Sequence, residues 1–185
     1  MRFCNLLGLT VSVFSVLAIT SQAAEGENHL LASHAQDLVA LQGEKLVPFK
    51  SDTFFEVPYT ILYFGAGWCS DCRRFSPDLV MAYDKQPKGR RDFEVLLLSL
   101  DKSQAGMVKY MVGEKMQWPA LAFDKLPVSL DISNYHAGRG IPWLSVIDRK
   151  GTVLLHSESD KDATNVLAQL QRLIASRDAG GKQGK

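Results

Sequence analysis

The sequence is poor in the residues that cross-link small domains or bind metals, with 3 cysteines and 4 histidines among 185 residues. Cys4 precedes an N-terminal apolar run and is expected to leave with it, so that Cys69 and Cys72 remain. Two cysteines cannot build the multi-bridge framework of a small secreted scaffold, and the loop between them is too short to constrain the unfolded chain. A chain of this length buries a core without such bonds. A purely stabilising role for the pair is therefore disfavoured.

The sequence also lacks an excess of charge of either sign. The 21 Lys and Arg residues nearly balance the 20 Asp and Glu residues, which gives a formal net charge of +1. No overall field therefore favours nucleic acid or an anionic membrane, and partners must be recognised at a local site. The sequence also lacks internal repeats and a second apolar core, which indicates one domain.

A long apolar run occurs only near the N-terminus, from Leu6 to Ile19, after a positively charged start. Together with the small residues that follow, it predicts a signal peptide over 1–23, cleaved after Ala23. A retained membrane anchor is the alternative. The run is, however, shorter than the roughly 20 residues of a spanning helix and is interrupted by Ser12 and Ser15. We therefore expect an exported protein, in a bacterial periplasm, that does not contact the membrane after cleavage.

Apolar periodicity predicts strands that alternate with helices, as in an α/β domain whose sheet is partly parallel. The expected strands are 38–41, 46–49, 59–64, 93–100, 143–148 and 153–156, and the expected helices are 70–85 with a kink at Pro77, 104–115 and 163–175. The predicted organisation is an N-terminal extension at 24–37, a domain at 38–176 that opens with a β-hairpin, and a flexible tail at 177–185.

Cys69 and Cys72 have the spacing that thiol–disulfide exchange requires, because a thiolate must attack a disulfide and a second thiol must resolve the mixed disulfide. Cys69 is predicted to be the nucleophile. It lies nearer the start of the helix, where unpaired amides and the positive end of the helix dipole stabilise an anion. Cys72 is the predicted resolving residue.

Other uses of the pair are disfavoured. A zinc site needs two further ligands, and none of the histidines lies near the pair or has ligand spacing of its own. Covalent haem attachment requires histidine directly after the second cysteine, a position occupied by Arg73. The alternative that the two cysteines are chemically inert remains. We expect neither a metal nor another cofactor.

Three segments resemble the thioredoxin-like superfamily, and within it the tryparedoxin and nucleoredoxin group. They are the motif segment from Tyr63 to Arg73, the segments 93–101 and 116–123, and the segment from Gly140 to Asp148. The resemblance covers about Leu38 to Ile174. It implies the thioredoxin fold, an α/β architecture with a central mixed β-sheet flanked by helices, here with an N-terminal β-hairpin extension.

The resemblance also implies a substrate-binding surface. Pro142 is implied to follow a cis peptide bond and to pack beside Cys69, while the backbone of Ile141 pairs with an extended substrate segment. Without the resemblance, Pro142 is equally a strand-initiating proline. Trp68 is implied to shield the thiols and to contact partners, although a lone tryptophan more often packs in a core. Trp118 either lines the same surface or packs.

Two departures from the thioredoxin pattern concern the chemistry. Many thioredoxins carry a buried acid as proton acceptor on the strand before the motif, where this chain has Tyr63, as in the tryparedoxin group. Asp101, at the end of the second central strand, is a candidate for proton transfer, and a solvated carboxylate is the alternative. The Ser70-Asp71 dipeptide stands where a proline often precedes the second cysteine, so the redox potential is not predicted.

These observations predict a thiol–disulfide oxidoreductase that acts on protein disulfides or dithiols, most simply as a periplasmic reductase. Such a reductase needs a separate redox partner, for example a membrane thiol transporter. The alternative is a redox-sensitive protein-binding module or chaperone that uses the groove of the fold without efficient turnover.

Overall fold

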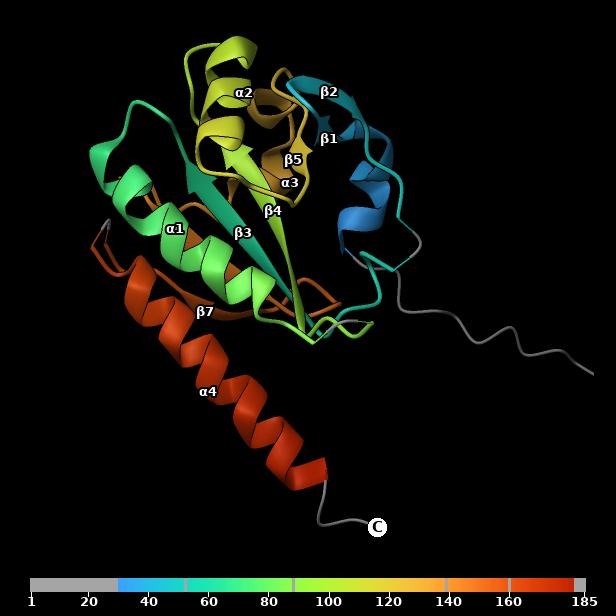
Figure 1. Cartoon of the computed structure of the whole chain (residues 1–185). Coiled ribbons are helices and arrows are strands. Elements are labelled where there is room, and N and C mark those ends of the chain that lie inside the picture. Colours follow the sequence, from blue (N-terminus) through green and yellow to red (C-terminus); the bar gives the residue numbers. More distant parts are fainter. Residues whose placement is uncertain (1–29, 52, 88, 139, 160, 182–185) are drawn as a thin grey trace, which may run out of the picture.

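The structure is a computed structural model that describes residues 30–51, 53–87, 89–138, 140–159 and 161–181. The predicted signal peptide at 1–23 lies outside the described residues. Helices cover both faces of a mixed sheet, with α1 and α4 side by side on one face (Figure 1). The elements are η1 (Leu30–Asp37), β1 (Leu38–Gln42), β2 (Lys45–Pro48), β3 (Tyr59–Gly65), α1 (Ser70–Asp84), β4 (Phe93–Ser99), α2 (Gln104–Gly113), β5 (Ala120–Leu121), η2 (Leu126–Val128), α3 (Leu130–Ser133), β6 (Trp143–Ile147), β7 (Val153–His156) and α4 (Ala163–Gly181), where η marks a 3₁₀ helix.

The described strands form one sheet in the order β2-β1-β5-β4-β3-β6-β7. The pairs β3–β4 and β4–β5 are parallel, and the other pairs are antiparallel. The N-terminal hairpin of β1 and β2 extends the sheet by pairing with β5, a strand of only 2 residues that the sequence did not reveal. The mixed α/β sheet predicted from the sequence is thus observed.

Alternation of side chains along the central strands divides the core into two halves. Ile61 and Tyr63 of β3 pack with residues of α1, α2 and α4, whereas Leu62 and Phe64 pack with residues of η1 and α3. Both halves are closed to water, which explains why the middle of each central strand, 61–64 in β3 and 95–98 in β4, is a continuous apolar run rather than alternating with polar residues. The cysteine motif comes directly after the last residue of β3, so the buried central strand fixes the place where the motif begins.

The predicted flexible tail at 177–185 is wrong for its first residues, because α4 continues to Gly181. Arg177 donates to the carboxylate of Asp92, and Asp178 accepts from Arg90 at 3.0 Å. Asp92 is only 7% exposed, so its charge requires these partners. The helix is extended by ion pairs between residues far apart in sequence, which local apolar periodicity does not report. Pro77 lies inside α1, which runs on to Asp84.

This network predicts a pH-dependent stability. Burial opposes ionisation of Asp92, but hydrogen bonds from Arg177 and Arg90 outweigh it and hold the pKa of this carboxyl below its usual value. Because the folded pKa is lowered, the stabilisation is present above the unfolded pKa of about 3.9 and is lost as the pH falls through the folded pKa. Asp92→Asn should therefore lower the free energy of unfolding in urea by about 1–2 kcal/mol at neutral pH, and by less below about pH 4.

The matched control is Asp84→Asn, which alters an exposed carboxylate at the end of α1 that accepts from Gln117 at 2.8 Å. It should change stability little at either pH. If Asp92→Asn lowered the free energy of unfolding by the same amount at neutral and at acidic pH, the stabilising role of the ionised Asp92 carboxylate would be contradicted.

Among the described residues, no helix combines the length and the apolar composition that a membrane span requires.

Candidate active site

The two cysteines lie at the N-terminal end of α1, directly after β3 and the Gly65-Ala66-Gly67 segment. Cys69 is the N-cap of α1, with extended backbone angles (φ −81°, ψ 118°), and its Sγ accepts a hydrogen bond from the backbone N–H of Cys72 at 3.1 Å. Sulfur thus takes the place of the side-chain oxygen that usually caps a helix. At this position the amides of the first turn and the helix dipole favour a negative charge on the sulfur.

The two thiols differ in accessibility and in their neighbours. Cys69 is 8% exposed, whereas Cys72 is fully buried at 0%. The Cys69 thiol donates to the backbone carbonyl of Ile141 at 3.4 Å, and the Ile141–Pro142 peptide bond is cis, as the resemblance implies. An incoming disulfide can therefore reach Cys69, whereas Cys72 has no exposed surface. This geometry suits an attacking Cys69 and a resolving Cys72.

A group of hydroxyls lies behind Cys72, and the Ser76 hydroxyl donates to the Cys72 backbone carbonyl at 2.8 Å. Burial is the largest influence on the Cys72 thiol and raises its pKa, the hydrogen bond with Cys69 raises it further, and a backbone hydrogen bond from Ala66 opposes that rise. Tyr63 lies 3.2 Å from Ser76 and 2.7 Å from Tyr110, measured between hydroxyl oxygens. Sequence reasoning missed Ser76 and Tyr110. Ser76 could have been found, since it lies one helical turn after Cys72, but Tyr110 belongs to α2 and carries no local signal.

Trp68 presents its ring to solvent beside the thiols. It is 56% exposed, and its indole N–H donates to the Leu100 carbonyl at 3.0 Å. The hydrogen bond satisfies the polar atom, so the apolar faces of the ring remain for contact with a partner. Trp118, in contrast, is 1% exposed and packs edge-on against Tyr83, so that it belongs to the core.

Asp101 binds the loop before the motif. Its carboxylate accepts from the Gly67 N–H at 3.0 Å and from the Ser99 hydroxyl at 2.9 Å. Arg73 holds the same loop from the other side by donating to the Gly67 carbonyl. The contacts described for Asp101 are therefore those of a residue that positions the loop, and proton transfer by this residue stays a prediction.

Asp101→Ala should accordingly loosen the loop. The backbone N–H of Gly67 would lose a charged acceptor, which corresponds to about 1–3 kcal/mol in the free energy of unfolding. Chemical denaturation measures the change, and amide hydrogen exchange at Gly67 should accelerate in the same variant. The control is Asp148→Ala, which removes an acid that caps the β6–β7 turn by accepting from Lys150 and Thr152. Faster exchange at Gly67 in the control as well would contradict the assigned contact.

Two grooves flank the thiols. One, of about 450 Å³, lies between Trp68 and α2 and includes the cationic side chains of Arg73, Lys102 and Lys109. The other, of about 270 Å³, lies between α1 and α4 and includes Pro142. Neither groove is lined by a cysteine, but Trp68 lines the first and Pro142 the second.

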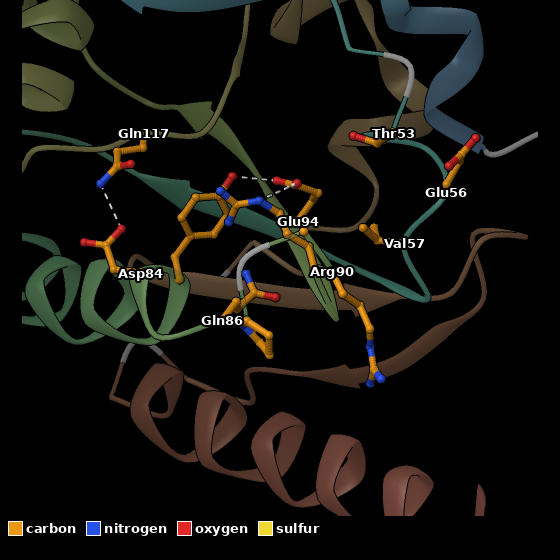
Figure 2. Close-up of a pocket in the computed structure, with 12 residues that line it drawn as sticks. Thr53, Glu56, Val57, Asp84, Gln86, Arg90, Glu94 and Gln117 are labelled. Atoms are coloured by element: carbon orange, nitrogen blue, oxygen red, sulfur yellow. Dashed lines mark hydrogen bonds and ion pairs between the residues drawn. The ribbon is translucent and has the colours of Figure 1, made fainter.

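A larger pocket, of about 560 Å³, lies at the other end of α1 (Figure 2). Glu94 accepts from the Tyr83 hydroxyl at 2.7 Å there, and Arg91 lies 3.2 Å from the same carboxylate. The charge of Glu94 is therefore paired with that of Arg91, and this pocket lies away from the thiols. Within the part of the chain that the structure describes, no three His, Cys, Asp or Glu side chains gather as metal ligands would.

The comparisons with known proteins agree with this geometry. Residues 58–153, which contain both cysteines and Pro142, match the family model described as thioredoxin-like. The chain belongs to the thioredoxin-like family of thiol–disulfide oxidoreductases. Its mixed sheet flanked by helices is the thioredoxin fold.

Curated relatives come from the group that the sequence resembles. Tryparedoxin of Trypanosoma brucei brucei is 36% identical over 87 residues, which cover 47% of this chain and 58% of that protein. Probable nucleoredoxin 1 of Arabidopsis thaliana is 31% identical over 144 residues, which cover 75% of this chain and 24% of that protein. The chain thus spans about a quarter of the length of the nucleoredoxins that it matches.

Solved structures of other proteins have the same fold. Thioredoxin from Wuchereria bancrofti superimposes with a TM-score of 0.56 at 26% identity, over 77% of this chain and 96% of that one. Tryparedoxin from Trypanosoma brucei superimposes with a TM-score of 0.55 at 27% identity, over 75% of this chain and 90% of that one. The thioredoxin-like domain accounts for most of the described residues.

Proposed function

We propose that this protein is an exported reductase that exchanges the Cys69–Cys72 dithiol with disulfides of protein clients. The observation that carries the proposal is the position of Cys69, whose sulfur caps α1 and lies 3.4 Å from the carbonyl of Ile141. A thiol at a helix N-terminus thereby lies beside the backbone of the half-buried residue Ile141.

The reaction proceeds in two exchanges. The Cys69 thiolate attacks one sulfur of the client disulfide, so that a mixed disulfide forms and the other client sulfur leaves as a thiolate. Cys72 then attacks Cys69, which forms the Cys69–Cys72 disulfide and releases the second client sulfur. The client gains two electrons and two protons, and the protein loses them. A separate reductant must return the dithiol.

Client recognition follows from the surface around Cys69. An extended client segment pairs with the backbone at Ile141 in the manner of an added strand, which requires no particular client sequence. Trp68 offers an apolar face to the residues beside the client cysteine. The expected clients are therefore proteins whose disulfide is exposed to solvent and lies in a segment that can extend.

The signal peptide predicted over 1–23 supports the proposal of a periplasmic location. Soluble cytosolic reductants are absent there, so electrons must arrive across the membrane, and a membrane thiol transporter is the partner that fits. Expression of the full chain in a bacterium tests the location. The proposal requires a product that begins at Ala24 in the periplasmic fraction, and a full-length product in the cytosol would refute it.

Reduction of insulin disulfides and the equilibrium potential against glutathione test the activity and its direction. A potential near about −270 mV suits a reductant, whereas one near about −120 mV suits an oxidant and would overturn the reductase assignment.

Trapping separates an enzyme from a binding module. Cys72→Ser leaves the attacking thiol and removes the resolving one, so an enzyme accumulates mixed disulfides with several clients, which migrate as separate bands until they are reduced. A redox-sensitive binding module captures a single partner or none. Cys69→Ser is the matched control and should trap nothing.

A further inference from the structure

His136 connects the loop before Pro142 to the core of the sheet. Its backbone N–H donates to the Ser133 carbonyl at 3.0 Å, and its ring Nε2 lies 3.0 Å from the Gly140 carbonyl oxygen. Because a carbonyl oxygen can only accept, Nε2 carries a proton and donates it to this hydrogen bond. The thiol-exchange chemistry described above does not use this histidine.

Two buried aromatic side chains hold the imidazole ring in place. Its centroid lies 5.0 Å from that of Phe64, with the rings tilted, and 5.4 Å from that of Trp143, which it meets edge-on. Phe64 and Trp143 are 1% and 2% exposed, and they are paired residues of β3 and β6. The donor atom of His136 therefore has a fixed position relative to the sheet, and through β3 also relative to the cysteine motif.

The loop that His136 contacts contains glycines in conformations that other residues rarely adopt. Gly138 and Gly140 have φ angles of +78° and +112°. Glycine restricts its own dihedral angles least, so the peptide plane that follows Gly140 can rotate unless a group outside the loop holds it. The hydrogen bond from His136 supplies this restraint, because it fixes the direction of the Gly140 carbonyl.

The Gly140 carbonyl and the Ile141 N–H belong to the same planar peptide unit, in which they point in opposite directions. A donor that fixes the carbonyl therefore also fixes the direction of the Ile141 N–H. Within the described residues this N–H has no hydrogen-bond acceptor, so it remains for the backbone of a bound client. The carbonyl of Ile141 accepts from the Cys69 thiol at 3.4 Å. The two polar backbone groups of Ile141 are thus directed by different partners.

We propose that His136 is a positioning residue that holds the Gly140–Ile141 peptide plane, so that the Ile141 N–H is directed at the backbone of a protein client. This rests on the proposed exchange function, in which an extended client segment pairs with Ile141. A donor on the carbonyl also strengthens the N–H of the same peptide, because hydrogen bonds in a chain polarise one another. His136 gives and takes neither electrons nor a proton. It favours protein disulfides, which have such a backbone, over small disulfides, which lack it.

Two variants separate the hydrogen bond from the packing of the ring, in full-length chains that all carry Cys4→Ser. His136→Phe keeps an aromatic ring against Phe64 and Trp143 but has no donor. His136→Gln loses the ring but can place an amide N–H near the position of the imidazole Nε2. Stopped-flow measurement follows the first exchange of the reduced protein, over a range of insulin concentrations and with dithiobis-nitrobenzoate, a small disulfide without a peptide backbone.

His136→Phe should raise the insulin concentration that gives half the limiting rate about two- to tenfold, as expected for one hydrogen bond. The limiting rate and the rate with dithiobis-nitrobenzoate should stay at the wild-type values. His136→Gln should return the half-saturating concentration toward that of the wild type.

The matched control is His156→Phe. His156 stacks on the same Trp143 ring with a centroid distance of 6.1 Å, but its Nδ1 donates to the Ser157 carbonyl at 2.8 Å rather than to the loop before Pro142. The half-saturating insulin concentration and both rates should therefore equal those of the wild type.

A spectroscopic measurement on the wild-type protein tests the hydrogen bond without any variant. The ¹⁵N signals of the His136 ring should show a proton on Nε2, and a neutral ring with its proton on Nδ1 would refute the proposal. The ¹³C signal of the Gly140 carbonyl should move in His136→Phe and keep its place in His156→Phe.

The outcomes separate this proposal from the one on which it rests. A wild-type protein that exchanges with neither disulfide would refute the exchange function, whatever the ¹⁵N signals of His136 show. Normal exchange with an unchanged half-saturating insulin concentration in His136→Phe would refute only the positioning role. An equal increase in His136→Phe and His136→Gln, or in His156→Phe, would assign the effect to ring packing and would refute that role as well.

Discussion

Cys69→Ser should reduce insulin-disulfide reduction to the uncatalysed background. Serine keeps the N-cap hydrogen bond to Cys72, because its hydroxyl oxygen accepts as sulfur does, so α1 should begin at the same residue. The remaining thiol, Cys72, is fully buried and cannot reach a client. The variant should therefore fold with wild-type stability while it loses its activity, and insulin turbidity together with denaturant unfolding measures both.

Cys72→Ser provides the comparison for this result. It should also lose turnover, but it should still attack a client once, which leaves one client bound per molecule. Turnover by Cys69→Ser at more than a small fraction of the wild-type rate would mean that Cys72, or a residue elsewhere, is the nucleophile. The geometry of the site would then be unrelated to the activity.

Trp143→Ala should have the largest effect on stability. Trp143 is 2% exposed, and its N–H donates to the Tyr135 carbonyl at 3.1 Å. Its ring stacks on His156 of β7 and meets His136 edge-on. Removal leaves a large cavity, although the Tyr135 carbonyl keeps the Ser145 hydroxyl as a donor at 2.7 Å. The free energy of unfolding should therefore fall by about 3–5 kcal/mol, a large share of the stability of an ordinary domain.

The same substitution should affect the site, because β6 begins at Trp143, directly after Pro142. We therefore expect a higher KM for protein clients even at temperatures where the variant is folded. Leu154→Ala is the control, since Leu154 lies on the neighbouring strand but is 40% exposed, and it should change stability by less than about 1 kcal/mol. A loss in Trp143→Ala no larger than in this control would contradict the packing described for Trp143.

Prediction from the sequence succeeded where the signal was local. The runs at 59–64 and 93–100 are mostly apolar because both faces of the central strands are buried, and the structure has β3 and β4 at these places. The helix at 70–85 follows from apolar residues at helical spacing, and α1 spans Ser70–Asp84. Prediction failed where an element depends on contacts with residues far away in the sequence. β5 exists through pairing with β1 and β4, and the end of α4 is held by Asp92.

The candidate site divides in the same way. Cys69 and Cys72, with the predicted roles of attacking and resolving thiol, follow from spacing and from a helix start, which are properties of neighbouring residues. Asp101 was found because it ends a strand beside the motif, but its contacts are with the Gly67 and Ser99 backbone and hydroxyl rather than with the thiols. Ser76 was missed although its position one helical turn after Cys72 could have indicated it, whereas Tyr110 belongs to α2 and has no local signal.

The sequence by itself therefore determined the candidate cysteine pair, the alternation of strands and helices, and the resemblance to the family. Only the tertiary structure decided what surrounds the buried thiol. Tyr63 and Tyr110 are 47 residues apart, and their hydroxyls meet at 2.7 Å because β3 and α2 pack in one core half. Such a contact depends on the orientation of two elements and on the space that Gly65 leaves, neither of which is encoded in any short stretch of the chain.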